Sequence, residues 1–149
     1  RALRHRQEVI FLKNKIICIN DSKATSFDAS LQSLSNYKNI YWIVGGLPKF
    51  KDNFYLKRVK SKIIRAYIIG DYTSFFKKKL QNVIPFTISK NIKIALDNIY
   101  KDLTLDKNTR STILLSPAAA SYDQFNNFEN RGVYFKKLAL KKLNNYKNV

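Results

Sequence analysis

The chain has 149 residues, 45% of them hydrophobic, and a net charge of +18, a composition that suits one folded domain and excludes wholesale disorder. No apolar run reaches the roughly 18 residues that a membrane helix needs. We therefore expect no membrane span. A single cysteine excludes an internal disulfide and a multi-cysteine metal site, and it fits a reducing compartment, so we expect a cytoplasmic protein.

The positive charge raises the question of a nucleic-acid partner. Lysine supplies 21 of the 28 cations and arginine only 7, although the planar arginine fork is the better clamp for phosphates and bases. Lysine, isoleucine and asparagine together fill 52 of the 149 positions, which is what A/T-rich codons produce. We therefore expect no specific nucleic-acid partner and keep a basic nucleic-acid-binding α/β domain as the alternative function.

The first elements in chain order are two short apolar segments, at residues 8–12 and 16–19. Asn14–Lys15 between them predicts a hairpin turn, because asparagine tolerates positive φ. A helix with apolar positions Phe27, Leu31 and Leu34 is expected next, capped by Thr25 or Ser26. The apolar run Ile40–Val44 then predicts a buried strand that ends in Gly45-Gly46.

The rest of the chain alternates in the same way. A lysine-rich helix at 54–63, a strand at 66–69, a helix at 72–80 and a strand at 83–88 are expected. They are followed by a helix with the apolar stripe Ile92, Ala95, Leu96 and Ile99, and by a strand at 112–115. The tail from 123 to about 144 is predicted to be helical, with Gly132 as a weak point or break.

Alternating strands and helices predict an α/β fold: a Rossmann-like, mostly parallel sheet with helices on both faces and an N-terminal β-hairpin, formed by residues 1–149 as a single domain. Ligands of such sheets bind at the loops that follow the carboxyl ends of strands. Three loops qualify, at 20–25, 45–49 and 116–122. Each loop alone also fits a purely structural role: the first as a capped loop, the second as a plain turn and the third as a tightly packed run of small residues.

The loop at 20–25 lies where a strand ends and a helix starts, so its backbone amides and the helix dipole predict an anion seat, with Lys23 and the Thr25 hydroxyl beside it. Lys49 could supply charge to the second loop. The sequence has no phosphate loop and no dinucleotide-binding glycine motif. Its one histidine, His5, lies near the start of the chain, so we expect no Ser-His-Asp catalytic set.

Taken in order, the three loops resemble the Mur ligase family, in particular the members that add D-glutamate to the peptidoglycan precursor. The resemblance rests on Asn-Asp-Ser-Lys-Ala-Thr at 20–25, on Gly45-Gly46 with Lys49, and on the long run from Ser116 to Gly132, which matches as Ser-Pro-Ala-x-Ala-Ser-x-Asp-Gln-Phe-x-Asn-Phe-Glu-x-Arg-Gly. It covers the whole chain, which would be the C-terminal domain of such a ligase.

The resemblance implies a function and a set of roles. In the family, ATP phosphorylates the carboxylate of UDP-N-acetylmuramoyl-L-alanine, and the amine of D-glutamate then attacks the acyl phosphate. An N-terminal UDP-binding domain and a central ATPase domain with the phosphate loop and Mg²⁺ would lie outside this chain, which binds D-glutamate and closes over ATP. The residues that match D-glutamate contacts are Lys23, Thr25, Lys49, Ser121, Tyr122 and Phe128. Arg6 and Asp21 match residues that reach the nucleotide. No residue of this chain matches a catalytic residue or a metal ligand, so the chain alone is expected to be inactive.

The sequence departs from the family pattern at three positions. Ala119 stands where cysteine is usual, Tyr122 replaces leucine or phenylalanine, and Arg4 replaces a proline before the His-Arg pair. None of these changes touches a charged ligand contact. Two other interpretations stay open: the basic nucleic-acid-binding domain, and a Rossmann-like structural or regulatory domain that kept the loops but lost activity.

Overall fold

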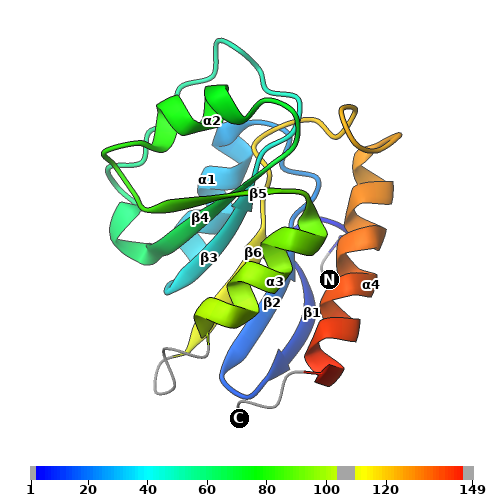
Figure 1. The fold of residues 1–149 in the computed structure, drawn as a ribbon. Coiled ribbons are helices and arrows are strands. Elements are labelled where there is room, and N and C mark those ends of the chain that lie inside the picture. The colour runs from blue at the N-terminus through cyan, green and yellow to red at the C-terminus, as the bar shows by residue number, and fades with distance from the viewer. Residues whose placement is uncertain (1–2, 104–109, 146–149) are drawn as a thin grey trace.

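The structure, a computed structural model, describes residues 3–103 and 110–145 (Figure 1). Its strands and helices alternate along the chain: β1 (Glu8–Lys13), β2 (Ile16–Asn20), α1 (Phe27–Asn36), β3 (Ile40–Val44), a 3₁₀ turn (Lys60–Lys62), β4 (Ile63–Ile69), α2 (Thr73–Leu80), β5 (Phe86–Lys90), α3 (Ile92–Leu103), β6 (Ser111–Leu115) and α4 (Phe128–Asn145).

The strands form one six-stranded sheet in the order β1-β2-β6-β3-β4-β5. Only the pair β1–β2 is antiparallel; the other pairs are parallel. The hairpin turn has Asn14 at φ 55° and Lys15 at φ 67°, the left-handed geometry that matches the twist of the flanking strands. The predicted fold class, mostly parallel sheet and N-terminal hairpin are therefore confirmed.

Helices cover both faces of the sheet, as predicted (Figure 1). Side chains of α1 and α2, such as Phe27 and Phe76, pack on one face together with Trp42 of β3. Side chains of α3 and α4, such as Ile99 and Phe135, pack on the other face. Both faces of the central strands are buried, which explains why Ile40–Val44 is a continuous apolar run rather than an alternating one.

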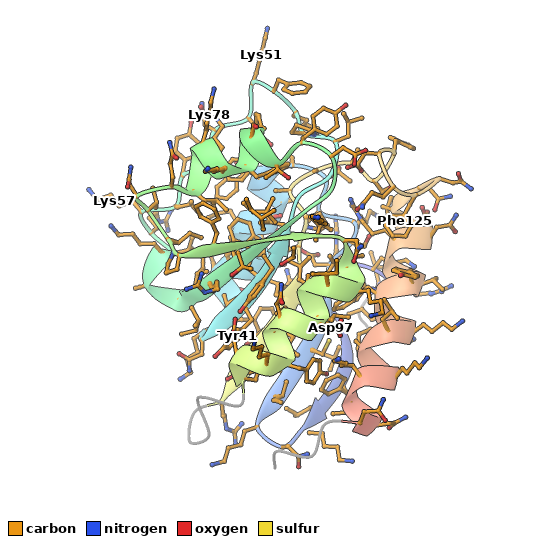
Figure 2. The ribbon with its side chains drawn as sticks, viewed as in Figure 1. Tyr41, Lys51, Lys57, Lys78, Asp97 and Phe125 are labelled. Atoms are coloured by element: carbon orange, nitrogen blue, oxygen red, sulfur yellow. The ribbon has the colours of Figure 1, made fainter. Side chains whose placement is uncertain are left out.

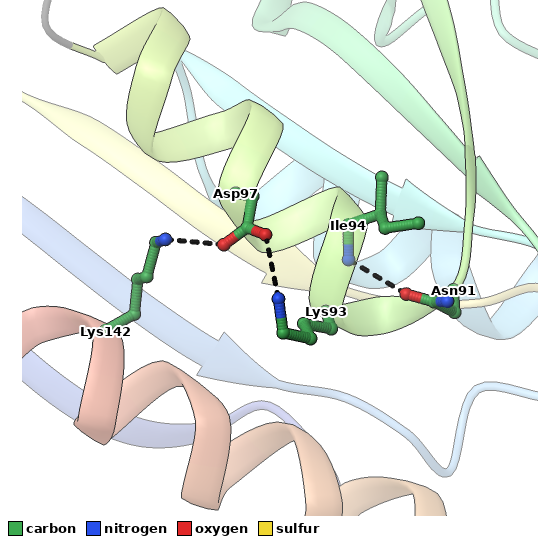
Figure 3. Close-up of polar contacts among 5 residues, drawn as sticks. All are labelled: Asn91, Lys93, Ile94, Asp97 and Lys142. Carbon is green, nitrogen blue, oxygen red and sulfur yellow. Dashed lines mark hydrogen bonds and ion pairs between the residues drawn. The ribbon is translucent and has the colours of Figure 1, made fainter.

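Polar contacts fix α3 and join it to α4 (Figure 3). The side chain of Asn91 accepts a hydrogen bond from the Ile94 amide at 2.9 Å and so caps the first turn of α3. Asp97 accepts from Lys93 on its own helix and from Lys142 on α4. These contacts lie on the surface and contribute modestly, because exposed ion pairs are each worth only about 0–1 kcal/mol.

The helix expected at 54–63 is wrong. Residues 52–56 form neither helix nor strand, and only single turns follow before β4 begins at Ile63. Leu56 and Val59 are buried in the core and Phe54 stacks on Phe27 with ring centroids 4.5 Å apart. The apolar spacing that suggested a helix therefore reflects separate anchoring points of an irregular segment, and β4 starts three residues before the expected 66.

Two further boundaries differ from the expectation. The strand expected at 83–88 begins only at Phe86, because Val83 and Ile84 donate to the Leu80 carbonyl in turns that follow α2, and it continues to Lys90. The last helix begins at Phe128 rather than 123. Gly132 is not a break, since α4 runs through it without interruption.

Lysine side chains point outward from different elements. Figure 2 shows Lys51 on the loop after β3, Lys57 before β4 and Lys78 on α2, all three projecting away from the body of the molecule. Among the described residues, no helix has both the length and the apolar content needed to cross a membrane.

Candidate functional site

The three loops singled out in the sequence follow β2, β3 and β6, and these strands are neighbours because β6 lies between β2 and β3. Backbone hydrogen bonds join the loops directly. The Asp21 amide donates to the Leu115 carbonyl at 2.8 Å, and the Gly45 amide donates to the Pro117 carbonyl at 2.9 Å. Leu47 and Ala120 exchange two bonds of 2.9 Å. The fold thus gathers the predicted loops at one end of the sheet, beyond the carboxyl ends of β2, β6 and β3.

The close approach of these loops depends on Gly45 and Gly46. Their φ angles of 129° and 139° are ones that residues with a side chain rarely adopt. A Cβ on Gly45 would overlap the backbone of Ile69, and a Cβ on Gly46 would lie 2.5 Å from the Ala120 carbonyl oxygen. The pair therefore lets the second loop pass between β4 and the third loop.

Asp21 is a buried junction between the first and third loops, with 4% of its surface exposed. Its Oδ2 accepts from the hydroxyls of Ser33 at 2.5 Å and Ser116 at 2.7 Å, and its Oδ1 accepts from the Gln7 amide at 3.1 Å. Burial raises the pKa of this carboxyl above its ordinary value, against the lowering effect of the hydrogen bonds. The Ser116 carbonyl is held in turn by the Trp42 indole at 2.7 Å.

The segment that presents Arg6 is fixed to the first loop by His5. The buried His5 ring has its Nδ1 2.9 Å from the Asn20 amide nitrogen, and its carbonyl accepts from the Lys23 amide at 2.9 Å. His5 and Gln7 both have positive φ, at 66° and 44°, so the chain turns sharply on either side of Arg6. Burial lowers the pKa of His5, which keeps the ring neutral near pH 7.

Several predicted ligand residues share two hollows. Arg6, Asp21 and Lys23 line a small pocket of about 40 Å³. Lys23 and Phe128, with His5, line an open hollow of about 510 Å³ on the other side of the same loop. Lys23 therefore stands between the residues matched to the nucleotide and one of those matched to D-glutamate.

The other predicted residues lie on the same edge with different exposure. Lys49 is exposed, and Tyr122 has 69% of its surface exposed. Ser121 is buried, and its hydroxyl has no hydrogen-bond partner among the described residues. Thr25 is half-buried and does not cap α1; the cap is Ser26, whose Oγ accepts from the Ala29 amide at 3.3 Å.

The predicted anion seat of backbone amides at 20–25 is smaller than expected. The amides of Ser22, Lys23 and Ala24 donate to acceptors inside the protein. The Phe27 amide, at the start of α1, donates to Asp52 at 2.8 Å, so a carboxylate of the chain already occupies that position. Side-chain cations such as Lys23 thus contribute more of the positive surface here than the helix terminus does.

The sequence reasoning assigned no role to Arg131, which the structure places under the loops. Its guanidinium donates from Nε to the Ser22 hydroxyl at 2.9 Å and from Nη2 to the Ser22 carbonyl at 2.7 Å, and only 1% of its surface is exposed. The Ser22 hydroxyl donates to the Phe128 carbonyl at 2.7 Å. The position of Arg131 within the long third motif was the only sequence signal.

The described residues contain no cluster of three histidine, cysteine, aspartate or glutamate side chains arranged to hold a metal ion. Cys18 is buried in β2, as expected for a small hydrophobe, and burial raises the pKa of its thiol. The arrangement therefore offers positive charge at the loops that follow the carboxyl ends of β2, β3 and β6.

No protein-family model matches the chain. It is 42% identical over 139 residues to the UDP-N-acetylmuramoylalanine–D-glutamate ligase of Rickettsia felis, a match that covers 93% of this chain and 31% of that protein. The proteins of the same name from Rhizobium johnstonii and Brucella abortus are 39% and 40% identical, over 90% and 93% of this chain and 28% and 30% of theirs. The chain thus spans about a third of the length of the curated relatives that it matches.

Proposed function

We propose that this chain, which is homologous to UDP-N-acetylmuramoylalanine–D-glutamate ligases over nearly its whole length, is the C-terminal, D-glutamate-binding domain of such a ligase, and that residues 1–149 form that one domain. The observation that carries the proposal is the gathering of the three matching loops on adjacent strands. The whole ligase would join D-glutamate to UDP-N-acetylmuramoyl-L-alanine in the cytoplasm, with ATP and Mg²⁺ bound mainly by the parts of the enzyme outside this chain.

D-glutamate is a dianion whose amine must remain free to attack. Lys23 and Lys49, exposed on two neighbouring loops, are suited to neutralise the two carboxylates. Each charge-assisted hydrogen bond is worth about 1.5–3 kcal/mol when water is excluded. Ser121, Tyr122, Phe128 and Thr25 complete the proposed contacts, Ser121 through its backbone or by reorientation, since its side chain is buried. The role of this chain is then to position the amine, which makes its attack effectively unimolecular.

Arg6 and Asp21 are proposed to face the nucleotide when the domain closes. Arg6 is exposed beside Lys23, so it is free to reach a phosphate. Asp21 uses Oδ2 twice but Oδ1 once inside the protein, which leaves Oδ1 the capacity to accept one more donor. Asp21 would therefore both hold the loops together and contact the ligand.

The test is the product of the complete gene. A G-x-x-x-x-G-K-[ST] phosphate loop encoded upstream of Arg1 is expected. The purified product should form an amide from UDP-N-acetylmuramoyl-L-alanine and D-glutamate with stoichiometric ATP cleavage, while the 149-residue chain alone should do neither. A complete product that lacks the phosphate loop, or that cleaves no ATP with both substrates present, would contradict the proposal and favour a domain that kept the loops without the activity.

The alternative function is that of a basic nucleic-acid-binding domain. The lysines labelled in Figure 2 come from three separate elements: the loop after β3, the segment before β4 and α2. Salt-sensitive binding of any DNA would report charge attraction only; discrimination between sequences that survives physiological salt would be needed to support that function.

A further inference from the structure

The guanidinium of Arg131 is a buried positive charge that the protein only partly satisfies. Its Nε and Nη2 donate to Ser22, a neutral residue, while its Nη1 has no hydrogen-bond partner among the described residues. No described carboxylate lies within ion-pair distance of it. Buried charges in proteins are normally paired, because an unpaired one costs several kcal/mol.

The unsatisfied end of Arg131 lies directly beneath the loop junction. A Cβ built on Gly46 would lie 3.4 Å from Nη1, 3.2 Å from the Ala119 Cβ and 2.5 Å from the Ala120 carbonyl oxygen. The next residue, Ser121, also has a buried hydroxyl without a partner among the described residues. The second and third loops therefore meet over a cation that has no ion-pair partner among the described residues.

Burial lowers the pKa of Arg131 to about 10, so the guanidinium remains charged at neutral pH. The acidic group that acts on it is Asp123, which raises this pKa, but the carboxylate of Asp123 accepts from the Asp71 amide at 3.0 Å instead of pairing with Arg131. The charge of Arg131 is therefore available to act on an anion held above the loops.

We propose that Arg131 is a specificity-determining positioning residue, whose buried charge, without an ion-pair partner among the described residues, makes the site select an amino acid with two carboxylates over one whose side chain is neutral. The inference rests on the proposed function, because it deepens the account of the same site. Arg131 is buried and does not need to contact the ligand, because its charge acts through space. A unit charge that acts over roughly 12 Å at an effective dielectric constant of about 20 changes the affinity for a carboxylate by about tenfold.

The experiment compares D-glutamate with D-glutamine in the complete ligase, since the two have nearly the same shape and D-glutamine carries a neutral amide in place of the side-chain carboxylate. The readout is the ratio of kcat/KM for the two amino acids, or the Ki of D-glutamine where it is not turned over. Arg131→Gln should lower the preference for D-glutamate about tenfold. Arg131→Lys should keep the preference even if both substrates are used less well, because it keeps the charge while changing the bonds to Ser22.

Two controls separate charge from structure. Arg65→Gln removes one positive charge near the start of β4, where Arg65 bonds to the Phe86 carbonyl, and should leave the ratio unchanged. Ser22→Ala removes the hydroxyl that Arg131 holds without changing any charge, and should affect both amino acids alike. A folded Arg131→Gln enzyme with an unchanged ratio would overturn the proposal.

If Arg131→Gln does not fold, Asp123→Asn tests the same field in the opposite direction. It removes the negative charge that opposes Arg131 but retains an oxygen for the Asp71 amide, so the preference for D-glutamate should rise. An unchanged or lowered preference would overturn the proposal. A wild-type enzyme without D-glutamate-dependent turnover would instead refute the proposed function itself, which distinguishes the two failures.

Discussion

At the scale of single residues, exposure separates the positions that can be tested cleanly from those that also hold the fold. Lys23, Lys49 and Arg6 are exposed, so their removal should change ligand contacts and little else. Asp21 is different. Asp21→Ala would leave the hydroxyl of Ser33 without its acceptor, at a cost of about 1–3 kcal/mol, whereas the hydroxyl of Ser116 would still have Ser30 as a partner at 2.9 Å.

In the complete ligase, Lys23→Ala and Lys49→Ala should each lower kcat/KM for D-glutamate by about 10- to 150-fold, the equivalent of one lost charge-assisted contact of roughly 1.5–3 kcal/mol. Use of the UDP-linked substrate should change less. Arg6→Ala should appear in the dependence on ATP instead, and steady-state kinetics with each substrate varied in turn would show this. If Lys49→Ala raised the KM for ATP and left D-glutamate kinetics unchanged, the assignment of the second loop would be wrong.

His5 should make stability depend on pH. Because burial holds its folded pKa below the ordinary value of 6.5, it contributes stability that is present above pH 6.5 and lost as pH falls through the lower folded pKa. Glu8 and Glu129 favour the protonated ring, while Arg4 and Lys136 oppose it. Protonated Nδ1 would also face the amide nitrogen of Asn20, placing two donors against each other.

Urea midpoints at pH 7.5 and 5.5 would measure this loss. His5 is the only histidine, so the difference between wild type and His5→Gln isolates its effect from that of Asp21 and Asp123, whose raised pKa values act in the opposite sense. The His5→Gln chain should lose less stability over this interval. An equal loss in both chains would mean that His5 is not the group that takes up the proton.

At the scale of elements, sequence patterns predicted well those segments whose structure follows from the spacing of their own apolar residues. The stripe from Ile92 to Ile99 became α3, and the apolar run Ile40–Val44 became a strand buried on both faces. The sequence patterns failed to predict the structure where a segment is held by contacts with residues distant in the sequence. Phe54 is fixed by Phe27, Phe75 and Phe76, none of which is near it in sequence, so spacing alone could not distinguish anchors of a loop from one face of a helix.

The candidate site shows the same division. The loops and their exposed cations were visible as motifs, and the structure brings them to one edge. The burial of Arg131 was not predictable, because it depends on contacts with Ser22, 109 positions away in the sequence. The use of the Lys23 amide was not predictable either, because it donates to the carbonyl of His5, on a segment that precedes β1.

Helix α4 contains an exception to helix propensity. Replacing glycine by alanine inside a helix normally stabilises it by about 1 kcal/mol. A Cβ on Gly132, however, would overlap the imidazole ring of His5. Gly132→Ala should therefore destabilise the chain, by about 1–3 kcal/mol as expected for overpacking of a core.

Urea unfolding would measure the effect of Gly132→Ala, with His5→Ala and the double variant as the cycle. The double variant should be more stable than the sum of the single changes predicts, because removing the imidazole makes room for the new methyl group. Strict additivity would show that the contact between α4 and His5 does not limit this position.

At the scale of the whole molecule, the candidate site lies along one edge of the sheet and its cations are exposed. An exposed contact between a lysine and a carboxylate is screened by water and restrains two flexible side chains, so it contributes only about 0–1 kcal/mol. Closure against the rest of the ligase would exclude water and strengthen the same contacts. Binding of D-glutamate would then be coupled to nucleotide binding through closure.

The 149-residue chain should therefore bind D-glutamate only weakly, with a dissociation constant above roughly 1 mM, or less than about 4 kcal/mol of binding free energy. Titration of the isotope-labelled chain with D-glutamate, followed through backbone amide shifts, would measure this. Small shifts confined to residues 20–25, 45–49 and 116–128 are expected. Micromolar binding would mean that the pocket is already complete without closure, and shifts centred on 77–79 or 136–142 would place the ligand on a different basic surface.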